Sequence, residues 1–517
     1  MSRPLVFLLL LLCASFLQVA TIDAAEPPLT RERVKAAVPA LEKLINDTLS
    51  ATGVPGMAIA IVHEGEVIHV GGYGVREAGK PAKVNSETVF LMASVSKPMA
   101  TTVIASVVGD GKVDWDDRVT DRLPGFQMSN PYVTREVTLR DFLCHRSGLP
   151  SQAGDLLEDI GYDRAAILHR LRFEKPASSF RSAYAYTNFG FTAAAEAAAR
   201  AAGQPWEELC EAKLYKPLGM SSTSSRYADF VKRDNRALIH VKRDGTWQPR
   251  FTRDADAQAP AGGVSSNAVD MAKWMILQLD EGKFGGKQIV DAKALAETHR
   301  PQMISGFQAA DNHVSLYGLG WGVSNTKGRV FWRHSGAFFI GERTEVALLP
   351  AGKLGIITFS NGAPTGLPEA INDSFFELVL NGELKSDWVK IWNGRFDQLV
   401  AMMVGQTTDF TRKPAERSPA QALKSYTGTY TNDYFGDAEI SESEGKLILK
   451  LGPKKLAFPM PHYNRDVFTY VPEGESSGGL GRPSGVTFTV AADGQAMQVV
   501  IENLNETGQG TFVRKQK

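Results

Sequence analysis

The sequence lacks a charge imbalance, a set of cysteines and, beyond its first residues, a long apolar run. Its 517 residues carry 57 basic and 57 acidic side chains, so the formal net charge is zero. A balanced charge gives no electrostatic footprint for nucleic acid or an anionic membrane surface, and we expect neither partner. Three cysteines do not make a disulfide framework. Two of them, Cys144 and Cys210, lie beyond the first 25 residues, and the sequence leaves open whether they pair.

What the sequence does have is enough apolar material for a large core. Hydrophobic residues make up 43% of the chain, so its composition is not that of a disordered protein. Single hydrophobic cores stop growing at roughly 250–300 residues. A chain of this length therefore predicts two or three domains.

The first 25 residues have the outline of a secretory signal peptide. Arg3 supplies the positive start, residues 5–17 form an apolar run, and Ala24 and Ala25 supply small residues near a cleavage point. The run is shorter than the roughly 20 residues of a membrane span. We therefore expect residues 1–25 to be removed. The mature protein should be periplasmic or secreted, from a bacterium, with no stable membrane span left after cleavage.

Residues 26–396 have the pattern of one mixed α/β (α+β) unit. Two apolar runs around a glycine turn, within 56–70, predict a β-hairpin, and a second hairpin is predicted within 346–359. After Ser94 the apolar period changes to that of a helix, which should stop near Gly109. Residues 192–202, rich in alanine, predict another helix.

The last part of the chain has a different pattern. Residues 397–420 are predicted to be a linker, because 406–420 mix Thr, Lys, Arg, Pro and Ser with little apolar content. Residues 421–517 alternate between apolar and polar positions, as in Leu447, Leu449 and Leu451, and turn dipeptides separate the runs. This alternation is typical of short strands and predicts a small all-β sandwich or barrel.

The segment that points most directly to chemistry runs from residue 90 to residue 100 and contains Ser94 and Lys97. A serine hydroxyl is a poor nucleophile until a base takes its proton. At a helix N-terminus, a lysine three residues after the serine lies on the same face, within reach of it. The lysine acts as that base only when neutral, which requires burial or cationic neighbours to lower its pKa. The same helix end directs backbone N–H groups, among them that of Ser94, at a developing oxyanion.

Ser-x-x-Lys alone also fits a capping serine followed by a surface lysine, but two further segments favour the catalytic interpretation. Tyr186 stands two residues before Asn188, ahead of a helix, and residues 334–336 read His-Ser-Gly on a predicted strand. Their order and spacing after Ser94 resemble the serine β-lactamase and penicillin-binding-protein superfamily, in its class C-like branch of esterases and D-peptidases. Supporting motifs lie at 138–150, 217–220, 262–265 and 317–321, and the resemblance covers roughly residues 30–385.

The resemblance implies a β-lactamase/transpeptidase-like serine hydrolase domain over residues 26–396, in which helices flank an antiparallel sheet and a second, all-helical subdomain stands beside it. Residues 421–517 are similar, around Tyr426, Gly428 and Tyr430, to the small lipocalin-like domain appended to some peptidases of this superfamily. A small C-terminal β-barrel is therefore expected. It could cover the active-site mouth, limit substrate size, mediate a homo-oligomer or act only as a stabilising appendage.

The resemblance also implies a covalent acyl-enzyme mechanism with no cofactor and no metal. Ser94 would be the acylated nucleophile and Lys97 its base partner, while Tyr186 would assist acylation and activate the deacylating water. Which of Lys97 and Tyr186 takes the first proton stays open. The same resemblance assigns substrate binding to Asn188, His334, Ser335, Gly336 and Ala337. Asn188 would hold a substrate amide or orient Lys97. The backbone N–H groups of Ser94 and Ala337 would form the oxyanion hole.

One departure from the family pattern bears on the substrate. Many members carry Lys-Thr-Gly where this chain has His334 followed by Ser-Gly. Histidine is mostly neutral at pH 7, so capture of a substrate carboxylate should weaken. We expect a serine hydrolase acting on small amides, D-amino-acid peptides or esters. The alternatives are a β-lactamase, or a penicillin-binding or cell-wall-sensing protein that is acylated with little turnover.

Two other motifs are assigned no catalytic role. Residues 474–478 satisfy the Gly-x-Ser-x-Gly pattern of another hydrolase fold, but the glycines and proline that follow forbid the helix which that motif requires. We predict a loop there. His145, within the 138–150 motif, is predicted to be structural.

Overall fold

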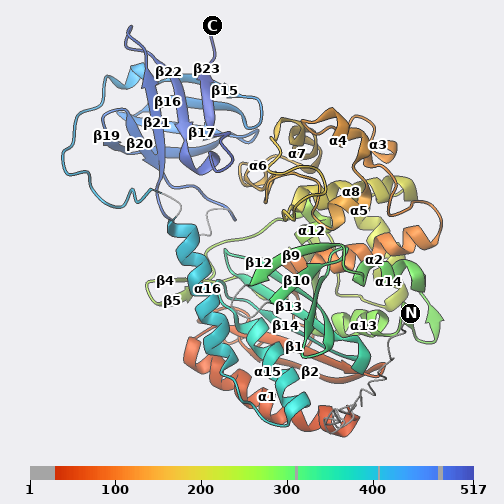
Figure 1. Cartoon of the computed structure of the whole chain (residues 1–517). Helices are drawn as coiled ribbons and strands as arrows, with labels where there is room; N and C mark the ends of the chain where they lie inside the picture. Colours follow the sequence, from red (N-terminus) through yellow and green to blue (C-terminus); the bar gives the residue numbers. More distant parts are fainter. Residues whose placement is uncertain (1–28, 309–312, 406–407, 476–480, 517) are drawn as a thin grey trace, which may run out of the picture.

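The computed structural model describes residues 29–308, 313–405, 408–475 and 481–516. The expected signal peptide, residues 1–25, lies outside them. Across these described ranges, no helix is both long and apolar enough to cross a membrane. The chain forms a larger part built around one sheet and a smaller part built around another (Figure 1).

The larger part is centred on an eight-stranded antiparallel sheet with strand order β2-β1-β14-β13-β12-β11-β10-β9. Its strands are β1 (Gly56–His63), β2 (Glu66–Gly74), β9 (Met303–Gln308), β10 (His313–Tyr317), β11 (Gly322–Thr326), β12 (Arg329–Phe338), β13 (Glu342–Leu349) and β14 (Leu354–Ser360). Both predicted hairpins are confirmed as β1–β2 and β13–β14.

Strand β1 is buried along its whole length because helices cover both faces of the sheet. Its alternate residues from Met57 to Ile61 join one hydrophobic cluster with α1 (Arg31–Thr52) and α15 (Leu367–Asn381). The residues between them, from Ala58 to Val62, join a second cluster on the other face. A strand buried on both sides is uniformly apolar rather than alternating, as observed for this segment.

Helices fill the space beside the sheet and make a separate, mainly helical region (Figure 1). The helix predicted after Ser94 is confirmed as α2 (Ser96–Gly109), which is buried on nearly all sides, and the alanine-rich one as α8 (Asn188–Ala202). The remaining helices of the larger part are α3 (Val119–Arg122), α4 (Pro131–Glu136), α5 (Leu139–Leu143), α6 (Asp155–Asp159), α7 (Arg164–Arg170), α9 (Trp206–Cys210), α10 (Lys216–Leu218), α11 (Tyr227–Val231), α12 (Ala259–Gly262), α13 (Ala268–Leu279) and α14 (Ala292–His299). Three short strand pairs complete it: β3 (Phe90–Leu91) with β6 (Ser265–Ser266), β4 (Val241–Arg243) with β5 (Thr246–Gln248), and β7 (Lys283–Phe284) with β8 (Lys287–Gln288).

The 138–150 motif is held by one buried carboxylate. Asp141 is 0% exposed, completes a capping box with Thr138 at the start of α5, and accepts hydrogen bonds from Arg146 Nε at 2.7 Å and Arg181 Nη2 at 2.8 Å. Burial alone would raise the pKa of Asp141, but the hydrogen bonds from Arg181 and Arg146 outweigh it and hold the pKa below its ordinary value. The carboxylate is therefore ionised in the folded protein at neutral pH.

Replacement of this carboxylate should destabilise the fold. Asp141→Ala removes the N3 half of the capping box and leaves two guanidinium groups without their shared partner, so we expect the free energy of unfolding to fall by about 3 kcal/mol. Urea denaturation followed by circular dichroism measures the change. Asp121→Ala, at an exposed position, is the matched control and should change stability by less than about 0.5 kcal/mol. Equal effects of the two variants would contradict the role given to Asp141.

The smaller part is a nine-stranded antiparallel sheet with order β18-β17-β16-β15-β23-β22-β21-β20-β19. Its strands are β15 (Gly428–Asn432), β16 (Gly436–Ser443), β17 (Lys446–Leu451), β18 (Leu456–Met460), β19 (His462–Asn464), β20 (Val467–Tyr470), β21 (Ser484–Val490), β22 (Ala496–Ile501) and β23 (Thr511–Arg514). Edge strand β18 contacts β20, so the sheet is a nearly closed barrel. The alternation seen in the sequence is confirmed, since the three leucines of β17 all point into the core. Its resemblance to a lipocalin-like domain stays a prediction.

Helix α16 (Trp388–Gly405) leads from the larger part to the barrel (Figure 1). The predicted linker, 397–420, therefore begins inside a helix, and 408–420 contains neither helix nor strand. The helix persists because it packs on α15, where Trp392 Nε1 donates to Asp373 Oδ2 at 2.8 Å, and because Phe396 is buried beneath the Arg343 guanidinium. Apolar residues also recur at helical spacing through 388–400, so the segment carries a local helical signal as well.

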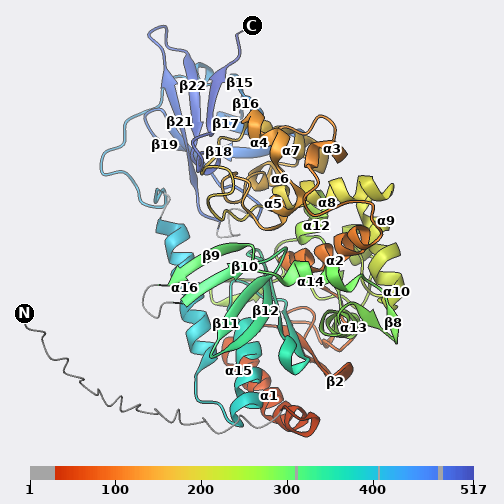
Figure 2. The same cartoon turned by 45° about the vertical axis from the view of Figure 1, so that its right-hand side comes forward.

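The barrel lies against the helical region near α6 and α7 (Figure 2). Tyr434 OH accepts from Gly154 N at 2.9 Å, and Tyr162 OH donates to the carbonyl of Phe435 at 3.0 Å. A Cβ at Gly452 would stand 1.8 Å from the carbonyl oxygen of Ile160, so the two backbones touch there. The contact places the barrel at the edge of the site described next.

Candidate active site

Ser94 lies in the turn Ala93–Val95 that leads directly into α2. Ala93 has φ +44°, in the left-handed region that non-glycine residues seldom occupy. Such strain costs on the order of 1–3 kcal/mol and persists only where the surroundings hold it. Here Ala93 is completely buried and packs in a hydrophobic cluster. The strained residue turns the chain so that Ser94 stands at the surface of a pocket.

Lys97 is completely buried beside Ser94. Its Nζ lies 3.2 Å from Ser94 Oγ, 2.6 Å from Asn188 Oδ1 and 3.0 Å from the carbonyl oxygen of Ala261. Burial lowers the pKa of Lys97 to about 7, and the negative charge of Asp155 opposes the change only in part. A neutral amine donates two hydrogens, which match the amide and carbonyl oxygens, and its lone pair then faces the hydroxyl of Ser94.

Tyr186 and Asn188 complete this cluster from the start of α8. Lys97 Nζ stands 4.5 Å from the centre of the Tyr186 ring, and Tyr186 shares a hydrogen bond with Ser94. Burial raises the pKa of Tyr186 above its ordinary value, so the phenol is protonated at neutral pH. Asn188 connects Asp155 to Lys97, because its Nδ2 donates to Asp155 Oδ2 at 2.8 Å while its Oδ1 accepts from Lys97.

Strand β12 forms the opposite wall, and its residues alternate between the pocket and the interior. Ser335 and Ala337 line the pocket. Gly336 faces inward, where a Cβ would stand 2.4 Å from the carbonyl oxygen of Met92 and 3.0 Å from Ser94 N. Only glycine therefore lets this strand approach the turn that carries Ser94.

His334 also faces inward and is not among the residues that line the pocket. Its Nε2 lies 2.9 Å from Tyr317 OH and its Nδ1 lies 2.7 Å from the carbonyl oxygen of Ser335. Burial, reinforced by the charge of Lys97, lowers the pKa of His334 to about 3, so the ring is neutral. A neutral ring with Nδ1 protonated donates to Ser335 and accepts from Tyr317. The expected place of His334 in direct substrate binding gains no support from this geometry.

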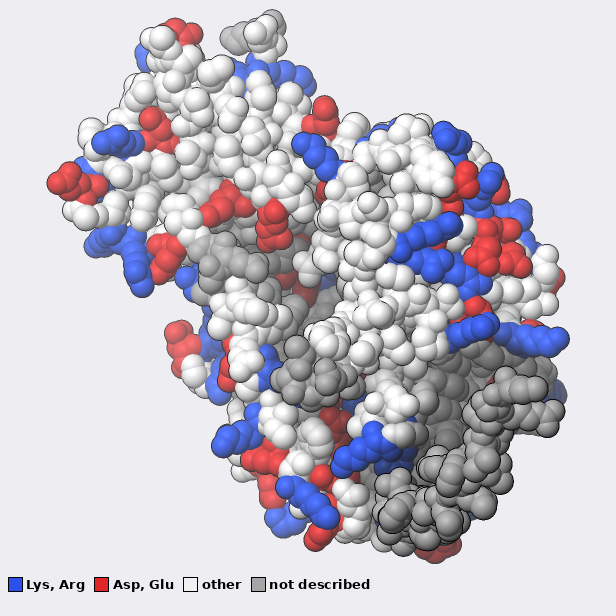
Figure 3. All heavy atoms as spheres, in the orientation of Figure 1, with Lys and Arg blue, Asp and Glu red and all other residues white. Residues whose placement is uncertain are grey.

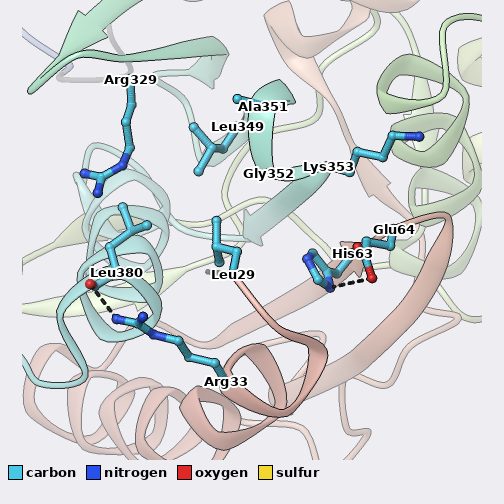
Figure 4. A pocket seen from close by; sticks show the side chains of 10 residues that line it. All are labelled: Leu29, Arg33, His63, Glu64, Arg329, Leu349, Ala351, Gly352, Lys353 and Leu380. Carbon is cyan, nitrogen blue, oxygen red and sulfur yellow. Dashed lines mark hydrogen bonds and ion pairs between the residues drawn. The ribbon is translucent and has the colours of Figure 1, made fainter. Parts of the chain in front are cut away.

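The hollow in front of Ser94, called here the Ser94 pocket, has a volume of about 200 Å³. It is lined by Ser94, Gln152, Asp155, Glu158, Asp159, Tyr186, Asn188, Arg253, Gln258, Ser335, Ala337, Phe338, Phe339, Arg343 and Glu475. A larger hollow of about 470 Å³ lies elsewhere, near the start of α1 and the β13–β14 turn (Figure 4). That hollow shares no lining residue with the Ser94 pocket and contains neither serine nor tyrosine.

Sequence reasoning missed the acidic lining of the Ser94 pocket. Asp155, Glu158 and Asp159 follow the 138–150 motif, and nothing in their spacing marks them as site residues. Glu475 belongs to the loop predicted at 474–478, of which residues 474 and 475 are described, and it reaches the pocket from the barrel. Its Oε1 accepts from Phe339 N at 2.6 Å, a contact between residues far apart in sequence.

The other residues considered from the sequence are buried in the fold. His145 Nδ1 accepts from Thr187 N at 3.2 Å, and burial lowers its pKa well below the ordinary value. This neutral, packed ring agrees with the structural role predicted for it. Of the cysteines in the described part of the chain, Cys144 and Cys210 are both buried and free.

Comparisons with known proteins agree with the fold and with the order of the motifs. A family model described as Beta-lactamase matches residues 41–376, and one described as Domain of unknown function (DUF3471) matches residues 412–514. The chain is 25% identical over 442 residues to Unguisins hydrolase ungD of Aspergillus violaceofuscus, covering 78% of this chain and 77% of that protein. It is 24% identical over 408 residues to the D-alanyl-D-alanine-carboxypeptidase/endopeptidase AmpH of Escherichia coli, covering 74% and 99%.

Two further relatives extend the comparison. Penicillin-binding protein 4 of Amycolatopsis lactamdurans is 26% identical over 341 residues, which cover 64% of this chain and 86% of that protein. Among solved structures, the octameric penicillin-binding protein homologue from Pyrococcus abyssi superposes with a TM-score of 0.58 at 17% identity, covering 92% of this chain and 100% of that one. This last likeness is one of fold.

Proposed function

We propose, because this chain belongs to the Beta-lactamase family, that it is a serine hydrolase which forms an acyl-enzyme on Ser94. The observation that carries the proposal is the arrangement of Lys97, whose Nζ lies 3.2 Å from Ser94 Oγ with two acceptors ready for its own hydrogens. A buried lysine with a pKa near 7 is largely available as a base at neutral pH.

Acylation would then proceed in a defined order. Lys97 takes the proton of Ser94 as its Oγ attacks the substrate carbonyl, and the resulting oxyanion accepts hydrogen bonds from the N–H groups of Ser94 and Ala337. The protonated phenol of Tyr186 gives its proton to the leaving amine or alkoxide. In deacylation, the phenolate left on Tyr186 takes a proton from the attacking water, and Lys97 returns one to Ser94.

The substrate class follows from the size of the pocket and from the neutral state of the histidine on strand β12. A volume of about 200 Å³ accommodates a small acyl group. The neutral, inward-facing His334 supplies no cation for a substrate carboxylate. We therefore propose small amides, D-amino-acid peptides or esters as substrates. Relatives named as a hydrolase and as a carboxypeptidase/endopeptidase support this class over a dedicated β-lactamase.

Export of the protein is proposed on separate grounds. Residues 1–25 have the signal-peptide pattern, and bacterial relatives carry names of cell-wall enzymes, such as the D-alanyl-D-alanine-carboxypeptidase/endopeptidase. The substrates of such an enzyme lie outside the cytoplasmic membrane. The mature protein would therefore work in the periplasm or outside the cell.

A panel of chromogenic substrates tests the proposed function. We expect the mature protein to turn over p-nitrophenyl acetate and D-alanine p-nitroanilide repeatedly. A chromogenic cephalosporin, whose carboxylate meets two arginines already paired with Glu158 and Glu369, should have a kcat/KM at least about 100-fold lower, the worth of one charge-assisted hydrogen bond. Release of one equivalent of product with no turnover would instead identify an acylated binder. Rapid cephalosporin hydrolysis would identify a β-lactamase.

A further inference from the structure

Four carboxylates from two parts of the chain line the Ser94 pocket. Asp155, Glu158 and Asp159 lie on one face of α6, at spacings of three and four residues. Glu475 comes from the barrel, in the loop that follows β20. Figure 3 shows acidic side chains beside the hollow between the barrel and the rest of the molecule.

The basic side chains of the pocket are already matched by acids. Arg253 Nη2 lies 2.5 Å from Glu158 Oε2, and Arg343 forms an ion pair with the buried Glu369, which is not part of the lining. Two arginines thus stand among four lining carboxylates, and one of them, Arg343, is paired with a carboxylate that does not line the pocket. More carboxyl groups than arginines therefore line the pocket, and burial raises the pKa of Asp155 and of Glu158 above their ordinary values.

Several of these carboxylate oxygens are buried and have no hydrogen-bond donor among the described residues. The Glu158 side chain is only 6% exposed, and its Oε1 has no hydrogen-bond partner within the described part of the chain. The same holds, among the described residues, for Asp155 Oδ1 and Glu475 Oε2. Buried polar atoms are nearly always paired in folded proteins, and in a pocket a bound water or a ligand that donates hydrogens can pair oxygens of this kind.

The missing donor is better matched by an organic cation than by a metal. Over the described residues, no group of three or more His, Cys, Asp and Glu side chains is arranged to hold a metal ion. An ammonium group carries three N–H donors and one positive charge, and it can satisfy oxygens that stand apart from one another.

Glu475 is placed at the right distance from the reacting carbonyl to bind such a group. Its Oε1 accepts from Phe339 N, two residues beyond Ala337, whose N–H we assign to the oxyanion hole. Two residues of extended chain span at most about 7 Å. In a substrate whose carbonyl is bound at the oxyanion hole, an amino group on the acyl part lies within about 7 Å of that carbonyl and can reach Glu475. An acyl part with a longer chain would collide with Glu475.

We propose that the acidic lining of the Ser94 pocket is an amine subsite, which receives the protonated amino group of the substrate's acyl part. The barrel completes this subsite by contributing Glu475. The inference rests on the proposed hydrolase function and narrows it to substrates with a free amino group close to the scissile bond. Substrates whose amine is capped by an acyl group lose the positive charge and are too large for the same space.

The ionisation of Glu475 fits a cation-binding role. Burial raises the pKa of Glu475 to about 7, and the facing Arg253 opposes the shift while Asp159 adds to it. Above pH 7 the carboxylate is ionised and attracts an ammonium group; below pH 7 it is protonated and loses that attraction. Preference for free-amine substrates should therefore decline as the pH falls below about 7.

A matched pair of substrates and a matched pair of variants test the subsite. D-Alanine p-nitroanilide and N-acetyl-D-alanine p-nitroanilide differ only at the amine. We expect the wild-type mature protein to favour the free amine in kcat/KM by at least about tenfold, the worth of a hydrogen bond to a charged group. Glu475→Gln should remove most of that preference. Glu473→Gln, two residues earlier at an exposed position, should retain it.

Binding measured without acylation separates this proposal from the proposed function. In a Ser94→Ala background, isothermal calorimetry with D-alaninamide should detect binding that N-acetyl-D-alaninamide lacks, and Glu475→Gln or Asp159→Asn should weaken it. Equal binding of the two amides, or a preference for the acetylated one, overturns the amine subsite. Amine-dependent binding without turnover of either p-nitroanilide by the wild type supports the subsite and overturns the hydrolase.

Discussion

Ser94→Ala should abolish covalent labelling by a fluorophosphonate and lower kcat/KM for p-nitrophenyl acetate by at least about 10⁴-fold, because Ser94 is the proposed carrier of the acyl intermediate. Intact-mass spectrometry of the mature protein measures the first effect, since one adduct forms in the wild type and none in the variant. The fold should survive, because the lost hydroxyl lies at the pocket surface and alanine suits the start of a helix.

Two observations would count against this prediction. Ser151→Ala, at an exposed position close to the pocket residue Gln152, is the control and should label like the wild type. A labelled Ser94→Ala protein would move the nucleophile elsewhere, and Ser335 is the next serine of the pocket lining that peptide mapping should examine. An unlabelled wild type with intact tertiary structure would show that the barrel blocks the pocket to the probe or that Ser94 is not reactive.

Much of the fold could be predicted because its signals are local. The hairpins β1–β2 and β13–β14, helix α2 and the alternating strands of the barrel are all encoded in apolar periods of the segments themselves. Helix α16 was not among the predicted elements, although apolar residues recur through it at helical spacing and tertiary contacts such as Trp392 with Asp373 also hold it.

The candidate catalytic cluster was predictable only as a set of motifs. The structure brings Ser94, Lys97, Tyr186 and Asn188 together from two helix starts, as the resemblance implies. Sequence spacing did not show that Ala93 would adopt a left-handed backbone conformation, because that strain is held by packing from distant residues.

The substrate-facing residues were the hardest to predict. Side chains alternate along a strand, so once Ser335 and Ala337 face the pocket, His334 must face inward toward Tyr317. The sequence did not reveal which of the two sets would face out. Glu475 carried no signal at all, because its place in the site depends on how the barrel docks near α6.

Lys97→Arg should lower kcat/KM by about 10²–10⁴-fold and remove the acid limb of the wild-type pH profile, because a guanidinium is never neutral and cannot take the proton of Ser94. In the wild type, burial sets the pKa of Lys97 at about 7. Below pH 7 the amine is protonated and cannot act as a base; above pH 7 it is neutral. The rate should therefore rise with pH through about 7 and then level off.

The assignment of that limb to Lys97 can be separated from its neighbours. Tyr186→Phe should slow the reaction but keep the midpoint near 7, because the pKa of Tyr186 is raised and it does not titrate there. Glu475 has a similar pKa, so the profile is recorded with the uncharged p-nitrophenyl acetate, and Glu475→Gln should keep the midpoint. His145 and His334 are excluded as the source, since burial holds the pKa of both rings well below 6.5. A midpoint that moves with Glu475→Gln, or an acid limb that persists in Lys97→Arg, would transfer the role of first base away from Lys97.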